Sequence, residues 1–273
     1  GEGTTEALEH YLNASWQICN AHDALMRPIT TKYAISSNGT TAIMDMASAA
    51  GLTLLSSEER NPMLTTTFGV GEMLKDAISK GCKHILLGIG GSATNDAGIG
   101  MLAALGVKFY DNHKREVTPI GKNLKLISSV DLSKIISLKT ITIDVICDVT
   151  NPLYGPNGAA HVYAKQKGAN STEIIELDNG LRHFATLCTT NPNTRGAGAA
   201  GGLGYALLSL NANLKNGAEI VLETAQLAHH IQDADLIFTG EGKIDEQTLC
   251  GKLPFAVLQM AKHIQKPVIA LAG

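Results

Sequence analysis

A short apolar run that ends in a glycine-rich loop constrains the fold more than any other feature of the sequence. Residues 83–87 have the length and apolar character of a buried strand. Residues 88–96 follow with three glycines, before an aliphatic helix that ends near Leu105. A strand, a glycine loop and a helix in this order are typical of a βαβ unit. The sequence therefore predicts an α/β fold.

Later segments repeat this alternation. Residues 141–147 alternate in polarity, which predicts a half-buried strand that places Asp148 at its carboxyl end. Residues 235–239 predict another strand, which is followed by a polar loop, a helix that begins near Pro254 and a returning strand over 267–272. Both segments extend the α/β pattern to the end of the chain.

Shorter signals complete the predicted pattern. The dipeptide Asn38-Gly39 is typical of a hairpin turn between two extended segments. Apolar residues at helical spacing predict one helix that includes Leu8 to Trp16 and another over about residues 71–80. Residues 107–110 and 218–223 are predicted to be strands.

Length, charge and cysteine content exclude several classes of protein. The 273 residues exceed the ~150 that are usual for one domain, so we expect roughly two domains. Lysine and arginine number 22 against 25 acidic residues, without a long basic run, so we expect no nucleic-acid partner. The five cysteines form no Cys-x-x-Cys pair, which argues against a zinc site and for a cytoplasmic location. No apolar stretch reaches the ~18 residues that cross a bilayer, so we expect no membrane partner.

The first glycine loop suits an anionic ligand, because loops between a strand and a helix expose backbone N–H groups. Gly88-x-Gly90-x-x-Ala93 also fits the dinucleotide fingerprint, and Asp111 follows about twenty residues later, where a ribose-binding acid would lie. An NAD-linked oxidoreductase of a small hydroxy acid is therefore one hypothesis. The loop continues into polar and acidic side chains, which would place negative charge where a pyrophosphate should lie. These are Ser92, Thr94, Asn95 and Asp96.

Carboxylates follow several of the predicted strands, and these loops face the ligand crevice in an open α/β sheet. Phosphoryl transfer needs such groups to hold Mg²⁺ and to orient the attacking hydroxyl, together with cations beside the phosphates. A solvated loop acid or a helix cap is the alternative for each, and Asp96 is the plainest capping candidate. The carboxylates are Asp96, Asp148, Glu241 and Asp245, and the cations in or beside the same loops are Lys165, Lys167, Arg195, Lys243 and Lys252.

Four segments, in order along the chain, resemble the bacterial type I glycerate kinase family. They are residues 88–96, 147–160, 196–204 and 239–252. Residues 1–4, Gly-Glu-Gly-Thr, resemble the end of a longer motif of that family, and we expect the whole protein to extend beyond both ends of the chain. Lys165 departs from the proline that is usual in the family, and Ala97 from a common glycine.

The resemblance implies ATP-dependent phosphorylation of D-glycerate with Mg²⁺. It also implies two α/β domains with the active site between them. One is flavodoxin-like, Rossmann-type and incomplete in this chain, and the other has an unusual α/β fold. We assign residues 1–12 and 228–273 to the remnant of the discontinuous flavodoxin-like domain and residues 13–227 to the central second domain. A catalytically silent ligand-binding module is a further alternative.

On this hypothesis the first glycine loop holds the carboxylate of glycerate, Asp148 and Glu241 place Mg²⁺, and Asp245 orients or deprotonates the attacking hydroxyl. Asp148 and Asp245 are open to an exchange of roles, and both O2 and O3 of glycerate are open as acceptors. The predicted substrate-binding residues are Gly90, Gly91, Ser92, Thr94, Asn95, Asp96 and Asn151. The predicted nucleotide-binding residues are Gly201, Gly202, Gly240, Glu241, Gly242, Lys243 and Thr248, and the predicted catalytic residues are Asp148, Asp245 and Lys252.

Overall fold

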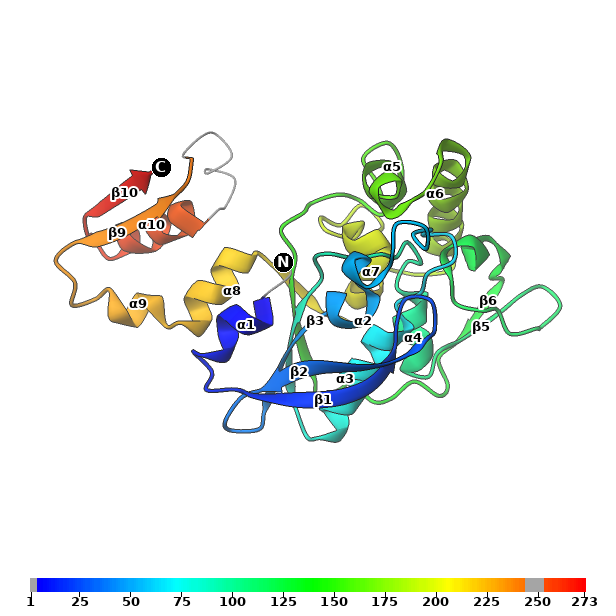
Figure 1. Cartoon of the computed structure of the whole chain (residues 1–273), viewed down its shortest axis with the longest axis horizontal. Helices are drawn as coiled ribbons and strands as arrows, with labels where there is room; N and C mark the ends of the chain where they lie inside the picture. Colours follow the sequence, from blue (N-terminus) through cyan, green and yellow to red (C-terminus); the bar gives the residue numbers. More distant parts are fainter. Residues whose placement is uncertain (1–3, 244–252) are drawn as a thin grey trace.

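A six-stranded mixed sheet organises the larger part of the chain (Figure 1). The computed structural model describes residues 4–243 and 253–273. β2 pairs antiparallel with β1 and with β3, whereas β3, β4, β7 and β8 run parallel to one another, so the predicted α/β fold is confirmed. The strands, in spatial order, are β1 (Ser15–His22), β2 (Pro28–Ile35), β3 (Thr41–Asp45), β4 (His84–Gly88), β7 (Thr142–Ile146) and β8 (Asn213–Lys215).

Helices cover both faces of this sheet, which explains why β4 is a continuous apolar run. Successive side chains of a strand point to opposite faces, so Ile85 and Leu87 enter the main core while Leu86 packs with Leu8 and Ile220 in a smaller one. The main core lies under α2 (Ala47–Ala50), α3 (Phe68–Ser79), α4 (Ile99–Ala104) and α7 (Ala199–Ser209), and the smaller one under α1 (Thr4–Glu9) and α8 (Gly217–Thr224).

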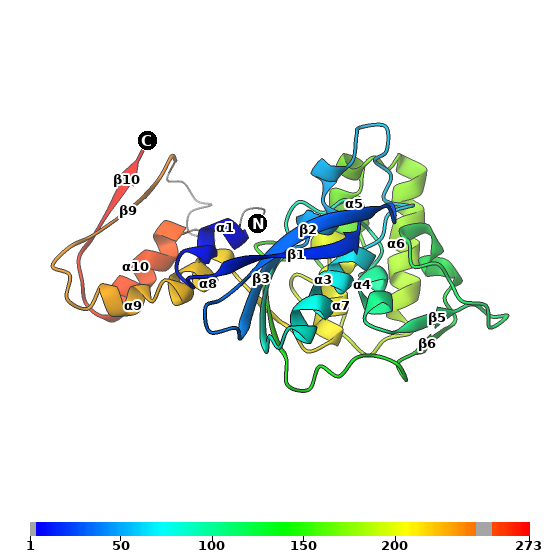
Figure 2. The ribbon, with the colours of Figure 1, turned by 60° about the horizontal axis from the view of Figure 1, so that its bottom comes forward.

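The remaining elements lie at the two ends of the molecule (Figure 2). At one end are α5 (Ala159–Tyr163), α6 (Ser171–Ala185), three short 3₁₀ helices, η1 (Leu52–Leu54), η2 (Gly121–Leu126) and η3 (Lys165–Lys167), and the antiparallel pair β5 (Lys108–Tyr110) and β6 (Ser129–Asp131). At the other are α9 (Leu227–His230), α10 (Leu253–His263) and the parallel pair β9 (Ile237–Glu241) and β10 (Val268–Ala272). No helix in the described ranges is long and apolar enough to cross a membrane.

The C-terminal elements form a third apolar cluster of their own. Val257 and Ala261 of α10 pack there against Ile237 of β9, together with Leu222 and Ile231. In both views this group lies beyond α1 and α8, to one side of the large sheet (Figures 1 and 2). The division into residues 1–12 with 228–273 and residues 13–227 stays a prediction.

Two local predictions are wrong. Residues 218–223 form α8 instead of a strand, because the side chain of Asn216 accepts a hydrogen bond from the N–H of Ala218 and caps a helix there. The N-terminal helix ends at Glu9, and Trp16 lies in β1. The strand predicted at 107–110 is confirmed as β5, which pairs with β6 outside the large sheet.

The last residue of the first glycine loop, Asp96, anchors the loop through a buried carboxylate. Asp96 is fully buried and accepts four hydrogen bonds, from the N–H and Oγ1 of Thr67 at 2.8 Å each and from the N–H groups of Gly98 and Gly100 at 3.1 and 3.2 Å. Burial raises the pKa of the Asp96 carboxyl group, and the four hydrogen bonds oppose that rise. Asp96 thus joins the start of α3 to the start of α4.

The second glycine loop packs directly against the first. The N–H of Ala97 donates to the carbonyl oxygen of Gly201 at 3.0 Å, and Ala200, Gly201 and Gly202 all have positive φ. A methyl group at Gly201 would overlap the carbonyl oxygen of Thr94. The two loops therefore fix each other through backbone contacts that only glycine permits at this position.

We expect Gly201→Ala to destabilise the protein more than Gly39→Ala. Both residues have nearly the same φ, +69° and +72°, but a Cβ at Gly39 meets nothing within 4 Å. The left-handed backbone costs about 1–2 kcal/mol in both variants, and overpacking should add about 1–3 kcal/mol only at Gly201. The free energy of unfolding in urea measures the difference. Equal costs would contradict the close packing of the two loops.

Candidate active site

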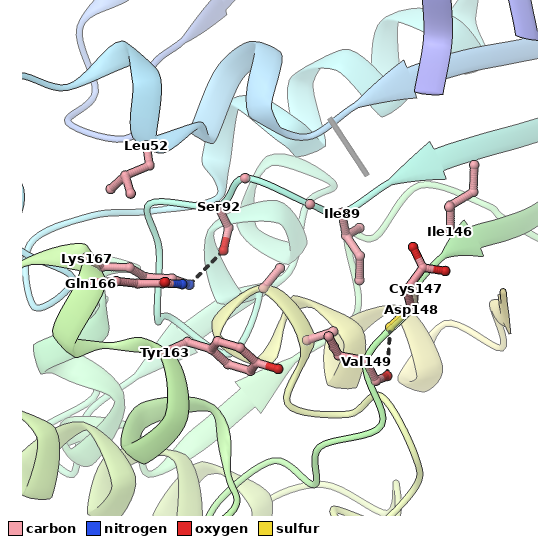
Figure 3. A pocket seen from close by; sticks show the side chains of 14 residues that line it. Leu52, Ile89, Ser92, Ile146, Cys147, Asp148, Val149, Tyr163, Gln166 and Lys167 are labelled. Carbon is pink, nitrogen blue, oxygen red and sulfur yellow. Dashed lines mark hydrogen bonds between the residues drawn. The ribbon is translucent and has the colours of Figure 1, made fainter. Parts of the chain in front are cut away.

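A cavity of about 300 Å³ opens at the carboxyl ends of β4 and β7. Residues 89–92 after β4 and 146–149 after β7 form two of its walls, and Tyr163, Gln166 and Lys167 form a third (Figure 3). Ala199, Ala200 and Leu52 complete the lining. Ligands of open α/β sheets bind at this edge, outside the carboxyl ends of parallel strands. The cavity is therefore the strongest candidate for a small-molecule site in the described part of the chain.

The first glycine loop presents unpaired backbone donors to this cavity. Within the described residues, the N–H groups of Gly90, Gly91 and Ser92 have no hydrogen-bond acceptor, although all three residues line the cavity. Gly91 has a φ of +70°, which turns the chain at this point. Successive N–H groups in such a turn make a concave site that favours anions.

A buried ammonium group lies beside the same loop. Lys167 is only 2% exposed, and its Nζ donates to Ser92 Oγ and to the carbonyl oxygen of Thr94, both at 2.7 Å (Figure 3). Burial lowers the pKa of Lys167 to about 7, while the charge of Asp96 opposes that shift. Sequence reasoning named Lys167 only among five loop cations, because a lysine in a polar segment gives no signal of its burial.

Asp148 lies on the opposite wall, as the pattern of β7 predicts. Its Oδ1 accepts a hydrogen bond of 2.8 Å from the N–H of Gly217, the first residue of α8, and its side chain is exposed. The positive end of the helix dipole favours a negative charge there. Asp148 thus brings an ionisable carboxylate to the same cavity as the unpaired N–H groups.

Asn151 contributes to the cavity through another side chain. Its Oδ1 accepts a hydrogen bond of 2.7 Å from the hydroxyl of Tyr163, and its Nδ2 donates to the carbonyl oxygen of Asn157. Tyr163 lines the cavity and Asn151 does not. The structure therefore shows Asn151 orienting a cavity residue, and direct substrate binding by Asn151 stays a prediction.

The later residues of the first glycine loop lie beneath the cavity wall. Thr94, Asn95 and Asp96 are completely buried. Thr94 Oγ1 and both side-chain polar atoms of Asn95 have no hydrogen-bond partner among the described residues. Both oxygens of Asp96 accept hydrogen bonds from Thr67, Gly98 and Gly100, so a structural role near the starts of α3 and α4 is observed, although the N-cap residues of these helices are Thr67 and Gly98. Contact of Thr94, Asn95 and Asp96 with substrate stays a prediction.

The predicted nucleotide-binding residues that the structure describes lie in two separate parts of the molecule. Gly201 and Gly202 are buried against the first glycine loop, and this packing alone accounts for them as glycines. Gly240 and Glu241 end β9, and Gly242 and Lys243 follow, in the C-terminal group of elements. Asp245, Thr248 and Lys252 lie outside the described residues. Phosphate binding by any of these residues stays a prediction.

A second buried carboxyl group at this edge of the sheet was missed by sequence reasoning. Asp45 ends β3 beside Gly88 of β4, and its Oδ2 accepts a hydrogen bond of 3.2 Å from the N–H of Thr5. Burial raises the pKa of Asp45, and its Oδ1 has no partner in the part of the chain described. The only sequence signal was its place after an apolar strand.

No ready-made metal cluster exists among residues 4–243 and 253–273, where no three or more His, Cys, Asp or Glu side chains come together. The carboxylate of Asp148 is nevertheless suited to bind a Mg²⁺ ion whose other ligands come from the substrate. Mg²⁺ typically takes one or two protein carboxylates and completes its shell with phosphate oxygens and water. Asp148 can supply one such oxygen from the cavity wall.

The structure does not place Asp111 where the dinucleotide-binding hypothesis needs a ribose-binding acid. Asp111 follows β5, outside the large sheet, and its carboxylate accepts hydrogen bonds from the N–H groups of His113 and Arg115 and from Arg115 Nε. These bonds stabilise a tight turn. Asp111 therefore does not lie at the sheet edge where a ribose would bind.

Comparison with known proteins supports a kinase. The sequence matches the glycerate kinase family over residues 1–273. It is 43% identical to the glycerate kinase of Bacillus subtilis (strain 168) and to the glycerate 2-kinase of Escherichia coli (strain K12), with all of this chain and 73% and 74% of those proteins covered. The structure matches a crystal structure of a glycerate kinase 2 from Salmonella typhimurium LT2 with a TM-score of 0.91 and 39% identity, over 100% of this chain and 75% of that one.

These matches confirm the resemblance carried by the four glycine-containing segments. The relatives are named as kinases of glycerate, and neither the oxidoreductase nor the silent binding module gains support from them. The family match extends over the whole chain. The chain belongs to the glycerate kinase family.

Proposed function

We propose that the cavity at the ends of β4 and β7 is the glycerate site of an ATP-dependent glycerate kinase. One observation carries this proposal: a single cavity joins the carboxylate of Asp148 to three N–H groups of the first glycine loop that have no acceptor among the described residues. The N–H groups suit the carboxylate of glycerate, and the carboxylate of Asp148 suits the reacting hydroxyl, whose proton it can accept, or a Mg²⁺ ion beside it. The family match supplies the reaction, and the cavity supplies a place for the acceptor.

The reaction transfers a phosphoryl group from ATP to a hydroxyl of glycerate. A bond forms between the hydroxyl oxygen and the γ-phosphorus, the bond to the β-phosphate oxygen breaks, and ADP leaves. The hydroxyl proton passes to a carboxylate, for which Asp245 and Asp148 are the two candidates. The name of the Escherichia coli relative supports O2 as the acceptor oxygen.

The protein contributes to this reaction mainly by positioning. The loop of Gly90 to Ser92 fixes one end of glycerate, so that its hydroxyl groups lie toward the wall formed by Asp148. Bound Mg²⁺ would neutralise charge on the phosphates, and Asp148 and Glu241 are the residues that we propose to hold it. Holding the two reactants in one geometry removes much of the entropic barrier to a reaction between two molecules.

We expect the intact protein to release ADP when it receives D-glycerate and Mg-ATP, with 2-phosphoglycerate as the product. A coupled ADP assay and ³¹P NMR of the product measure both outcomes. NAD should not bind, because the acid that would contact its ribose lies in a separate turn. Saturable NAD binding without ADP release that depends on glycerate would contradict the proposed function.

The two candidate carboxylates should respond differently to removal of their charge. Asp245→Asn should lower kcat by roughly 10²–10⁴-fold at every Mg²⁺ concentration if Asp245 is the base. Asp148→Asn should raise the Mg²⁺ concentration that half-saturates the rate if Asp148 is a ligand. Steady-state kinetics at varied Mg²⁺ separate these roles.

Asp111→Asn is the control for both carboxylate variants. It should leave kcat unchanged and alter the free energy of unfolding by no more than ~0.5 kcal/mol, because the amide oxygen can still accept both backbone N–H bonds of the turn and only the contact with the exposed Arg115 side chain is lost. The melting temperature of each variant shows whether it is folded. Unchanged kinetics in both Asp148→Asn and Asp245→Asn would refute their proposed roles.

A further inference from the structure

Within residues 4–243 and 253–273, no acidic side chain is bonded to the buried ammonium group of Lys167. Its ammonium group is almost wholly inaccessible, and both of its hydrogen bonds go to uncharged oxygens of the first glycine loop. No ion pair joins it to a carboxylate in the described residues. Burial of an unpaired charge is expensive, so buried charges in proteins are normally paired. The charge of Asp96 favours the ammonium form without an ion pair to it. Among the described residues no carboxylate is bonded to Lys167, so the ammonium can bind an anionic ligand.

The surroundings of Lys167 hold its side chain in place. It ends the short helix η3, and the chain then turns at Gly168, where a φ of +101° and the carbonyl oxygen of Arg60 leave no room for a side chain. Ser92 Oγ and the carbonyl oxygen of Thr94 fix the ammonium from the other side. The ammonium position is thus fixed before any ligand binds.

The remaining donor of Lys167 matches the cavity. An ammonium group has three N–H donors, and the two bonds to the loop leave one. Lys167 lines the cavity together with Gly90, Gly91 and Ser92, whose N–H groups are also unpaired in the described structure. One small volume therefore combines a fixed positive charge with several backbone donors.

We propose that Lys167 binds the carboxylate of glycerate and makes the site specific for an acid over uncharged compounds of the same size. This inference rests on the proposed function, because it assigns a charge contact within the same cavity. The hydrogen bonds of the loop orient the carboxylate, and Lys167 supplies the charge that a neutral amide or aldehyde cannot use.

A proton is coupled to this contact. The pKa of Lys167 is lowered to about 7, so part of the population holds a neutral amine near that pH. A bound carboxylate favours the ammonium form, so binding raises the pKa and takes up a fraction of a proton. The affinity for glycerate should consequently fall as the pH rises above about 7.

The test compares Lys167→Met with Lys165→Met in the intact protein. Lys165 is exposed on the same 3₁₀ helix and does not line the cavity, so its loss matches the change in charge without touching the site. Titration calorimetry with D-glycerate should show roughly a 10- to 100-fold weaker Kd for Lys167→Met and an unchanged Kd for Lys165→Met. The Kd for Mg-ATP should not change in either variant.

Proton uptake by the unaltered protein provides a second readout that does not depend on the fold of a variant. Calorimetry near pH 7.5 in two buffers of different ionisation enthalpy should show uptake with D-glycerate and none with glyceramide, the neutral amide. Binding of glycerate without proton uptake would contradict the lowered pKa of Lys167 in the free protein. An equal Kd in the two lysine variants, or a loss of affinity confined to Mg-ATP, would overturn the role of Lys167.

The outcomes for the two proposals are distinct. ADP release that depends on glycerate tests the proposed function without any change to Lys167. If that activity is present and the affinity for glycerate does not depend on Lys167, the kinase assignment holds and the inference about the carboxylate contact fails.

Discussion

The buried carboxylate of Asp96 is the interaction on which the site depends. It gathers four hydrogen bonds from Thr67, Gly98 and Gly100, and it thereby ties the first glycine loop to the starts of two helices. Without these donors, a carboxylate with no access to water would carry the full cost of desolvation. Gly201 then presses against the backbone of Thr94, so the loop is held from both sides. A loop fixed in this way can keep its N–H groups pointed at a ligand.

The fixed position of the first glycine loop matters for ligand binding. The unpaired N–H groups of Gly90, Gly91 and Ser92 and the ammonium of Lys167 face one cavity, and no carboxylate of the described chain pairs with that ammonium. The ammonium is buried, so its interaction with an anion is stronger than in bulk water, because the effective dielectric constant around it is lower. Asp148 lies across the cavity at the start of α8, so positive and negative groups occupy separate walls. This separation suits a substrate with a carboxylate at one end and a reacting hydroxyl at the other.

Much of the fold was predictable, because the signals were local. The run at 83–87 with its glycine loop, the alternation that ends at Asp148 and the Asn38-Gly39 turn each specify an element through a few neighbouring residues. The segment 218–223 misled because a short run of mixed polarity fits both a strand and a helix, and the cap at Asn216 decides between them. The burial of Lys167 and Asp45 was not predicted, because burial arises from contacts between residues far apart in sequence. Asp96 was predicted as a substrate-binding or capping residue, but no spacing rule reveals its bonds to Thr67.

The central claim is that glycerate binds between the first glycine loop and Lys167, and a crystal structure of the intact protein with D-glycerate tests it most directly. The account predicts the carboxylate of glycerate within hydrogen-bond distance of Lys167 Nζ and of the N–H groups of Gly90 to Ser92. It also predicts the hydroxyl groups on the side of Asp148. Glycerate bound elsewhere, for example beside residues 240–243, with the cavity filled by water alone, would contradict the account.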